Sequence, residues 1–380
     1  MNFTKLTNFL DSLPAIGIPG VDCIVKQGYN TIFRHQAGYA DREKQIPMNG
    51  TESFFLYSSS KPITCTAVLQ LYEQGKILLT DPISDYIPEF GNMQILHHKG
   101  NRESVLLPAK NAITISNLLS MTSGLDYNLT GPAILEVQNR TGGRAPTKEV
   151  IRALASQTLC YEPGTRWQYS LSHDVLGALI EIVSGQQFGT YLKKHIFDPL
   201  EMNNTRFAHA GDYPESMMAQ YRRNNETGEV SRINLENEYI LGSEYESGGA
   251  GLISTVDDYG KFVAAMANNG RAHTGEWILS RATIDLMRLN QLNGQQMLDF
   301  DWPQFAGYGY GLGVRTMVDP ARGGANSPVG EFGWGGAAGT YLLIDPKNRI
   351  SMFYTQHMRE SMECYVHPRL RNVLYACLEE

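Results

Sequence analysis

Residues 54–63 read Phe54-Phe55-Leu56-Tyr57-Ser58-Ser59-Ser60-Lys61-Pro62-Ile63 and hold the only Ser-x-x-Lys of the 380-residue chain. An apolar strand end meets a helix here, because apolar residues then recur at helical spacing. Residues three apart share a helix face, so the Lys61 ammonium can reach the Ser58 hydroxyl. A helix start also supplies unpaired N–H groups and a positive dipole end. The stretch therefore predicts a nucleophilic serine with a neighbouring base.

The tetrapeptide alone has a simpler explanation. About one chance match to Ser-x-x-Lys is expected in a chain of this length. A serine at a helix start is also a common N-cap, and a lysine one turn later is commonly solvated. Further segments of the chain are needed to distinguish a catalytic Ser58–Lys61 pair from an N-cap serine followed by a solvated lysine.

The composition narrows the class of protein. With 42% hydrophobic and 19% charged residues, the chain can bury a large core, and its length indicates two lobes. A net charge of −7 and a pI of about 5.8 argue against nucleic acid and anionic membranes as partners. The five cysteines are odd in number and form no Cys-x-x-Cys, which favours free thiols in a reducing compartment.

The N-terminal residues predict an amphipathic helix rather than a signal peptide, because no basic segment precedes an unbroken apolar stretch. No segment is long and apolar enough to cross a bilayer, so no membrane insertion and a cytoplasmic location are expected. No sequence feature indicates an oligomeric state.

The order of predicted elements indicates an α+β fold. A strand hairpin comes first, a mostly helical middle follows, and glycine-rich strands with a terminal helix close the chain. We expect residues 1–65 and 215–380 to form a discontinuous α/β lobe around a central antiparallel sheet flanked by helices. Residues 66–214 would form a mostly helical lobe, with the active site in the groove between them. The predicted strands are 21–26, 31–40, 310–317, 331–334, 340–344 and 350–356, and the predicted helices include 115–121, 147–156, 172–184, 188–196, 256–268 and 368–377.

Two further segments can complete a serine site. Tyr169 stands at the end of a loop, directly before an amphipathic helix, where it could serve as a proton-transfer group or as a core-edge residue. The glycines of residues 333–340 let a backbone approach a ligand closely, and an edge strand there could direct an N–H at a carbonyl. A plain glycine-rich turn is the alternative for that segment.

Together, and in this order, the three elements resemble the serine β-lactamase and penicillin-binding-protein superfamily, and most closely its class C β-lactamase and family VIII carboxylesterase branch. The resemblance covers nearly the whole chain and implies a β-lactamase/transpeptidase-like fold with an all-helical lobe. Further segments that follow the family pattern are Ile18-Pro19-Gly20, Gly38-Tyr39-Ala40-Asp41, Leu118-Leu119-Ser120-Met121-Thr122-Ser123-Gly124-Leu125, Pro163-Gly164-Thr165, Gly248-Gly249-Ala250-Gly251-Leu252-Ile253-Ser254-Thr255 and Gly307-Tyr308-Gly309-Tyr310-Gly311-Leu312-Gly313.

The resemblance implies a role for each site residue. Ser58 would be the acylated nucleophile, Lys61 its base, and Tyr169 the group that relays protons to the leaving group and to water. The backbone N–H groups of Ser58 and Ala337 would form the oxyanion hole. No metal and no organic cofactor is implied.

The chain departs from the β-lactamase pattern at the substrate-binding positions. Tyr-x-Asn is replaced by Tyr169-Ser170-Leu171, and Lys-Thr-Gly by Trp334-Gly335-Gly336. Each lost charged hydrogen bond is worth about 1–3 kcal/mol, so β-lactam recognition should be weakened by several kcal/mol. Leu171, Trp334, Gly335 and Gly336 would then contact neutral, apolar-flanked acyl compounds. Trp-Gly-Gly resembles family VIII esterases, which favours a serine hydrolase that cleaves small-molecule carboxylic esters through a Ser58 acyl-enzyme.

Other functions stay open. A β-lactamase, a D-amino-acid peptidase or other amide hydrolase, and a transesterase share the chemistry, and a non-catalytic acyl-binding or sensor domain would share the fold. His273-Thr274-Gly275 spells another known form of the third motif but is predicted to be a surface turn. His173 could line the rim of the site, but a surface position is predicted for it, and His97-His98 lack a third metal ligand. The aromatic residues Trp302, Phe305, Tyr308 and Tyr310 could wall the acyl pocket or fill the core.

Overall fold

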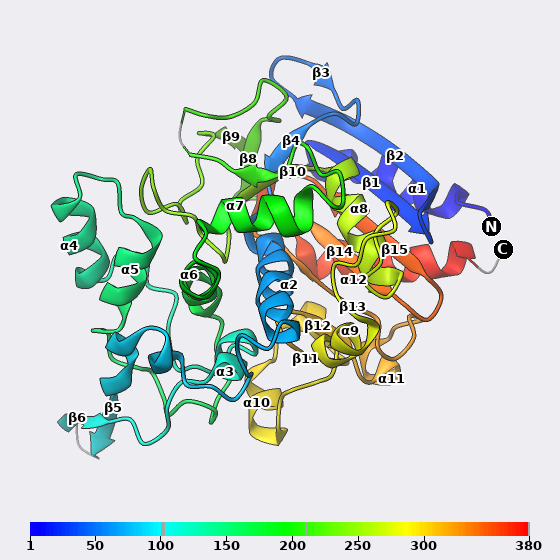
Figure 1. The fold of residues 1–380 in the computed structure, drawn as a ribbon. Helices are drawn as coiled ribbons and strands as arrows, with labels where there is room; N and C mark the ends of the chain where they lie inside the picture. The colour runs from blue at the N-terminus through cyan, green and yellow to red at the C-terminus, as the bar shows by residue number, and fades with distance from the viewer. Residues whose placement is uncertain (100–102, 210, 379–380) are drawn as a thin grey trace.

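An eight-stranded antiparallel sheet lies in one half of the molecule in the computed structural model, which describes residues 1–99, 103–209 and 211–378 (Figure 1). Its strand order is β11-β12-β13-β14-β15-β1-β2-β3, so strands from the two ends of the chain pair through β1 and β15. The strands are β1 (Gly20–Gln27), β2 (Asn30–Asp41), β3 (Ile46–Pro47), β11 (Tyr308–Tyr310), β12 (Arg315–Met317), β13 (Phe332–Gly335), β14 (Tyr341–Asp345) and β15 (Ile350–Thr355).

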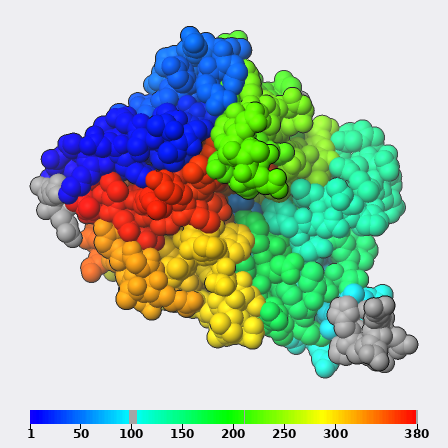
Figure 2. Space-filling model, turned by 180° about the vertical axis from the view of Figure 1, so that it is seen from behind, coloured from blue at the N-terminus to red at the C-terminus, as the bar shows by residue number. Residues whose placement is uncertain are grey.

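Helices cover both faces of this sheet because its strands bury side chains on both sides. In β1, Val21, Cys23 and Val25 pack in one core together with α1 (Thr4–Ser12) and α12 (Glu363–Leu378). Ile24, which points to the opposite face, packs in the larger core with α8 (Val256–Ala267). Figure 2 shows the first and last segments of the chain (blue and red) side by side at the left of the view, and the middle segments (cyan and green) gathered at its right.

The middle of the chain supplies most of the remaining helices. The central one, α2 (Ser60–Glu73), is buried over most of its length and packs against α6 (Ser172–Ser184) (Figure 1). The other helices are α3 (Ile115–Leu119), α4 (Pro132–Arg140), α5 (Thr147–Leu154), α7 (Phe188–Leu192), α9 (Arg281–Met287), α10 (Gly294–Asp299) and α11 (Pro320–Gly323). No helix in the described ranges is long and apolar enough to cross a membrane.

Three smaller sheets complete the fold. Their strand orders are β4-β10-β7, β16-β8-β9 and β5-β6. The strands are β4 (Ser53–Phe55), β10 (Leu252–Thr255), β7 (Arg206–Phe207), β16 (Met358–Arg359), β8 (Gln220–Arg223), β9 (Val230–Ile233), β5 (Gln94–Lys99) and β6 (Glu103–Pro108). The first of these sheets matters for the site, because β4 leads directly into Ser58.

The predicted α+β class with an antiparallel sheet is confirmed, and helix 172–184 has the predicted bounds. Two predicted elements were wrong. The single strand over 310–317 is two strands, because the chain turns between them and the Gly311 N–H donates to the Val314 carbonyl. The last helix begins at Glu363 rather than at Pro368, since Pro368 lies inside the helix. The division of the chain at residues 65 and 215 stays a prediction.

Candidate active site

Ser58 lies where β4 passes through a short 3₁₀ turn, Tyr57–Ser59, into α2. Tyr57, the residue before it, has a φ of 47°, in the left-handed region that a bulky residue seldom adopts. The Tyr57 hydroxyl donates to the carbonyl of Glu236, and the Arg359 guanidinium lies 5.1 Å from its ring centre. These contacts stabilise the unfavourable backbone conformation of Tyr57. That conformation places Ser58 directly before α2.

Lys61 is fully buried and faces Ser58, as the sequence predicts. Its Nζ lies 3.3 Å from the Ser58 Oγ and 3.4 Å from the Tyr127 hydroxyl, and it donates to the Gly249 carbonyl at 2.7 Å. Burial lowers the pKa of Lys61 to about 7, since a buried ammonium loses its hydration. A lysine with this pKa is substantially neutral near pH 7 and can accept the Ser58 proton.

Tyr169 lies on the other side of the lysine. The Lys61 Nζ is 4.6 Å from the centre of its ring, and the Trp334 indole N–H donates to its hydroxyl at 3.4 Å. Burial raises the pKa of Tyr169, and the neighbouring Ser58 and Trp334 only partly offset that rise. The phenol therefore keeps its proton at neutral pH. It is suited to pass a proton on, whereas Lys61 is the group able to take one.

The end of β13 closes the site opposite Ser58. Gly336 lies so close to the β4–α2 junction that a Cβ there would come 2.3 Å from the Leu56 carbonyl oxygen and 2.3 Å from the Thr340 Oγ1. Within the part of the chain that the structure describes, the backbone N–H groups of Ser58 and Ala337 donate to no protein oxygen. Two free donors are what an oxyanion hole needs, and their role stays a prediction.

Tyr127 is a site residue that sequence reasoning missed. Besides its contact with Lys61, its ring stacks on Tyr169 at 5.5 Å between centres and meets Tyr239 edge-on at 5.6 Å. It lies two residues beyond Leu125, where the segment that follows the family pattern ends. A loop carries no periodicity, however, so nothing in the sequence indicated that its side chain turns to Lys61.

The sequence predicts a surface position for His173 and a substrate contact for Leu171. The surface position predicted for His173 is wrong: the residue is 0% exposed, because α6 is buried on nearly all sides. Burial lowers its pKa to about 3, so the imidazole is neutral. Leu171, at the start of the same helix, is 2% exposed and packs in the main core. Its proposed contact with substrate stays a prediction, and it offers little surface for one.

The aromatic residues that precede the late strands serve both suggested purposes. Trp302 is half-buried and meets the Tyr169 ring at 5.5 Å, so it belongs to the wall of the site. Tyr310 is 0% exposed and packs edge-on against Trp334 at 5.1 Å, as part of the core behind that wall. Trp334 itself is 2% exposed and backs Tyr169.

A pocket of about 380 Å³ lies beside Ala337 and carries charged groups, although no charged partner was expected near the glycine-rich segment. Arg359 lines it and pairs with Glu238 at 2.7 Å. Glu363 lines it too, and burial raises the pKa of its carboxyl to about 7. The pocket therefore has polar positions where a substituent of the substrate could bind.

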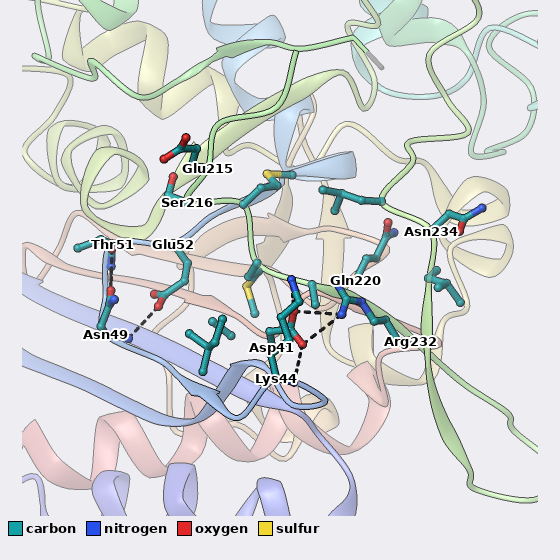
Figure 3. Close-up of a pocket in the computed structure, with 17 residues that line it drawn as sticks. Asp41, Lys44, Asn49, Thr51, Glu52, Glu215, Ser216, Gln220, Arg232 and Asn234 are labelled. Atoms are coloured by element: carbon teal, nitrogen blue, oxygen red, sulfur yellow. Dashed lines mark hydrogen bonds and ion pairs between the residues drawn. The ribbon is translucent and has the colours of Figure 1, made fainter. Parts of the chain in front are cut away.

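A second pocket of about 470 Å³ lies apart from these residues, between the β2–β4 segment and the β8–β9 hairpin (Figure 3). Asp41 binds Arg232 at 3.0 Å and Lys44 at 3.7 Å, whereas Glu52 accepts the backbone N–H groups of Asn49 and Gly50. None of the residues predicted for catalysis lines it.

No cluster of three His, Cys, Asp or Glu side chains that could hold a metal occurs among the described residues, which exclude the side chains of His97 and His98. His273, Thr274 and Gly275 form an exposed turn in which His273 contacts Glu201 at 3.0 Å. This turn is formed by the segment after α8, whereas β13 supplies the third element of the site.

The chain is similar to known proteins over nearly its whole length. The "Beta-lactamase" family model matches residues 6–372, and the chain belongs to this family. Esterase EstB of Burkholderia gladioli is 30% identical over 94% of this chain and 91% of its own. Protein Rv1367c of Mycobacterium tuberculosis is 29% identical over 89% of this chain and 85% of its own.

Solved structures share the same architecture. EstCE1, described as a hydrolase with promiscuous acyltransferase activity, superposes with a TM-score of 0.78 at 27% identity and covers 98% of both chains. Simvastatin synthase LovD of Aspergillus terreus reaches a TM-score of 0.80 at 20% identity, over 98% of this chain and 97% of its own, which shows the fold alone. The protein is thus a serine hydrolase with the β-lactamase fold.

Proposed function

We propose that the protein is a carboxylesterase that works through a Ser58 acyl-enzyme. The observation that carries the proposal is the buried Lys61, whose Nζ lies 3.3 Å from the Ser58 Oγ and whose pKa is lowered to about 7. The similarity to an esterase over nearly the whole chain supports the same conclusion.

The geometry suggests an order of events. Ser58 attacks the ester carbonyl while its proton passes to neutral Lys61, and the N–H groups of Ser58 and Ala337 bind the oxyanion. The alcohol then leaves with a proton delivered through Tyr169, which gives the acyl-enzyme. In the second half, water attacks the acyl carbon and passes a proton through Tyr169 to Lys61. The bond from that carbon to the Ser58 Oγ then breaks, the carboxylic acid leaves, and Ser58 regains its proton.

An ester is favoured over a β-lactam because of what borders the nucleophile. Trp334 occupies the position where the β-lactamase pattern has a lysine, and it stacks on Tyr169 at 5.9 Å. The aromatic wall offers no cation for a β-lactam carboxylate at that position. The cation that lines the neighbouring pocket, Arg359, is already paired with Glu238.

A substrate panel tests the proposal. Purified protein is offered p-nitrophenyl acetate and butyrate, a chromogenic cephalosporin and a D-Ala-D-Ala peptide, with Ser58→Ala as the matched control. We expect steady ester turnover that Ser58→Ala abolishes. Ester turnover that survives in Ser58→Ala would contradict Ser58 as the nucleophile. Fast cephalosporin turnover with weak ester activity would make a β-lactam, rather than an ester, the preferred substrate. A burst without steady turnover would indicate an acyl-binding sensor.

Acyl transfer to an alcohol is a second candidate. EstCE1 is a hydrolase with promiscuous acyltransferase activity, and the half-buried Trp302 gives the site here an apolar wall on which an acceptor alcohol could pack. Adding a primary alcohol to the ester assay separates the two outcomes, because transfer yields a new ester in place of the free acid.

A further inference from the structure

Asp174 is a buried carboxylate that the proposed mechanism does not use. It lies in the first turn of α6 and is 1% exposed. Its Oδ1 accepts from the Tyr245 hydroxyl at 2.9 Å and from the Ser247 hydroxyl at 2.7 Å. Burying a carboxylate costs several kcal/mol of folding free energy unless hydrogen bonds or an opposite charge compensate it. The surroundings of its second oxygen therefore matter as well.

That second oxygen, Oδ2, has no hydrogen-bond partner among the described residues. It points at Gly249, where a Cβ would lie 2.6 Å from Oδ2, 3.2 Å from the Lys61 Nζ and 3.2 Å from the Tyr127 hydroxyl. The empty Cβ position of Gly249 therefore lies between the carboxylate and the ammonium, and the Gly249 carbonyl accepts a hydrogen bond from Lys61 at 2.7 Å. Carboxylate and ammonium face each other across one glycine without a direct ion pair.

We propose that Asp174 is a positioning residue for Lys61: its anchored carboxylate fixes the charge and orientation of the ammonium that faces Ser58. The inference rests on the proposed Ser58 chemistry and adds to it the element that tunes the base. Tyr245 and Ser247 hold the carboxylate in place, and glycine at 249 keeps the space between the two charges open.

Asp174 is the carboxyl group that faces Lys61. Burial raises its pKa, whereas the hydrogen bonds from Ser247 and Tyr245 and the charge of Lys61 lower it and favour the carboxylate. Cys65 lies on α2 together with Lys61, and burial raises the pKa of its thiol, which stays neutral. His173 is neutral because its pKa is lowered to about 3. The neighbouring phenols Tyr127, Tyr169, Tyr245 and Tyr310 all have raised pKa values through burial and stay protonated.

The direction of the effect follows from charge. Burial lowers the pKa of Lys61, while the Asp174 carboxylate opposes that shift by favouring the ammonium. Without the carboxylate the ammonium loses its proton at a lower pH. The pH at which Ser58 becomes reactive should then fall, whereas a role in packing alone would leave that pH unchanged.

A fluorophosphonate probe measures this without any assumption about the natural ester. The Ser58 Oγ–P bond forms, fluoride leaves, and the hydroxyl proton passes to the base. Labelling rates are followed from about pH 5 to about 9.5 in the wild type, Asp174→Asn and Asp174→Ser. We expect both variants to move the midpoint of the rise down by about one pH unit or more, with a lower plateau. An unchanged or higher midpoint in the folded variants overturns the inference.

Controls separate the possible failures. Asp258→Asn removes another buried, hydrogen-bonded carboxylate and should leave the midpoint in place. If neither Asp174 variant folds, Ser247→Ala replaces them in the test. Losing one donor to Oδ1 disfavours the ionised carboxyl, so the midpoint of labelling should move down by a smaller amount. An unmoved midpoint in Ser247→Ala overturns the inference. Labelling that persists in Ser58→Ala overturns the proposed function together with the inference, whereas Ser58-dependent labelling with an unchanged midpoint overturns the inference alone.

Discussion

Lys61 combines full burial with contacts to three oxygens, those of Ser58, Tyr127 and Gly249. An ammonium in water would be better solvated, so burial favours the neutral amine, and the pKa falls to about 7. A general base works best when its pKa lies near the working pH. The environment of one side chain therefore suits Lys61 to the role that its place in Ser-x-x-Lys suggests.

This pKa predicts the pH dependence of ester hydrolysis. Because only the neutral amine accepts the Ser58 proton, kcat/KM should rise with pH through a midpoint near 7 and level off above it. The profile is measured with a p-nitrophenyl ester at a wavelength where phenol and phenolate absorb equally. A profile that is flat from about pH 5.5 to about 8.5 would contradict Lys61 as the base.

Tyr169→Phe tests the proton relay. The variant keeps the ring that stacks on Trp334 and Tyr127 and removes only the hydroxyl. We expect kcat for ester hydrolysis to fall by about 10²–10⁴-fold, with a smaller change in KM and an unchanged circular dichroism spectrum. Tyr245→Phe is a matched control at a buried tyrosine whose hydroxyl binds Asp174 rather than Ser58, and its effect on kcat should be much smaller. Equal losses in the two variants would argue against a relay at Tyr169.

Local spacing explains which site residues the sequence could reveal. Ser58 and Lys61 lie one helical turn apart, so their contact follows from helix geometry alone. Tyr127 and Asp174 reach Lys61 through tertiary packing of a loop and of α6. Asp174 could not be told from a solvated first-turn carboxylate, because its burial depends on the segment around Gly249 that packs over it.

At the scale of elements, the site depends on how closely β13 approaches the start of α2. Ser59 and Thr340 join the two through a hydrogen bond of 2.7 Å between their hydroxyls. Gly336 fits between them only because it lacks a side chain. The separation of these two elements sets the distance between the Ser58 N–H and the Ala337 N–H.

Gly336→Ala should therefore reduce activity more than stability. The new Cβ would meet the Leu56 carbonyl oxygen at 2.3 Å, so β13 must move away from Ser58. We expect kcat to fall by at least about 10²-fold if the displaced N–H no longer binds the oxyanion. Ester kinetics are compared with those of Gly294→Ala, where a Cβ meets nothing within 4 Å and no loss is expected. Wild-type kinetics in Gly336→Ala would contradict the close approach.

Elements with one strong periodicity were predictable, and those shaped by tertiary contacts were not. The apolar pattern of α6 gave its bounds from Ser172 to Ser184. The two short strands β11 and β12 could not be separated within an unbroken glycine-rich run, since their turn is fixed by pairing with each other and with β13. Pro368 suggested a helix start, whereas the structure accommodates it one turn inside α12.

At the scale of the whole molecule, a buried ion pair lies within the central sheet behind the site. Arg315 on β12 and Glu331 just before β13 are 1% and 0% exposed and lie 3.1 Å apart. Arg315 also donates to the carbonyls of Trp334 and Leu342, and Glu331 accepts from the Tyr308 hydroxyl. The pair thus connects β11, β12, β13 and β14, the strands that carry the glycine-rich side of the site.

Removing one partner should destabilise the whole fold, because the other charge would remain buried without compensation. We expect Glu331→Gln to lower the free energy of unfolding by about 3–5 kcal/mol. The exposed pair Lys193–Asp198 provides the matched control, since Asp198→Asn should change stability by less than about 1 kcal/mol. Urea unfolding followed by fluorescence and circular dichroism measures both. A Glu331→Gln variant as stable as Asp198→Asn would mean that Arg315 gains solvent or another partner when Glu331 is neutral, and that the sheet does not depend on this pair.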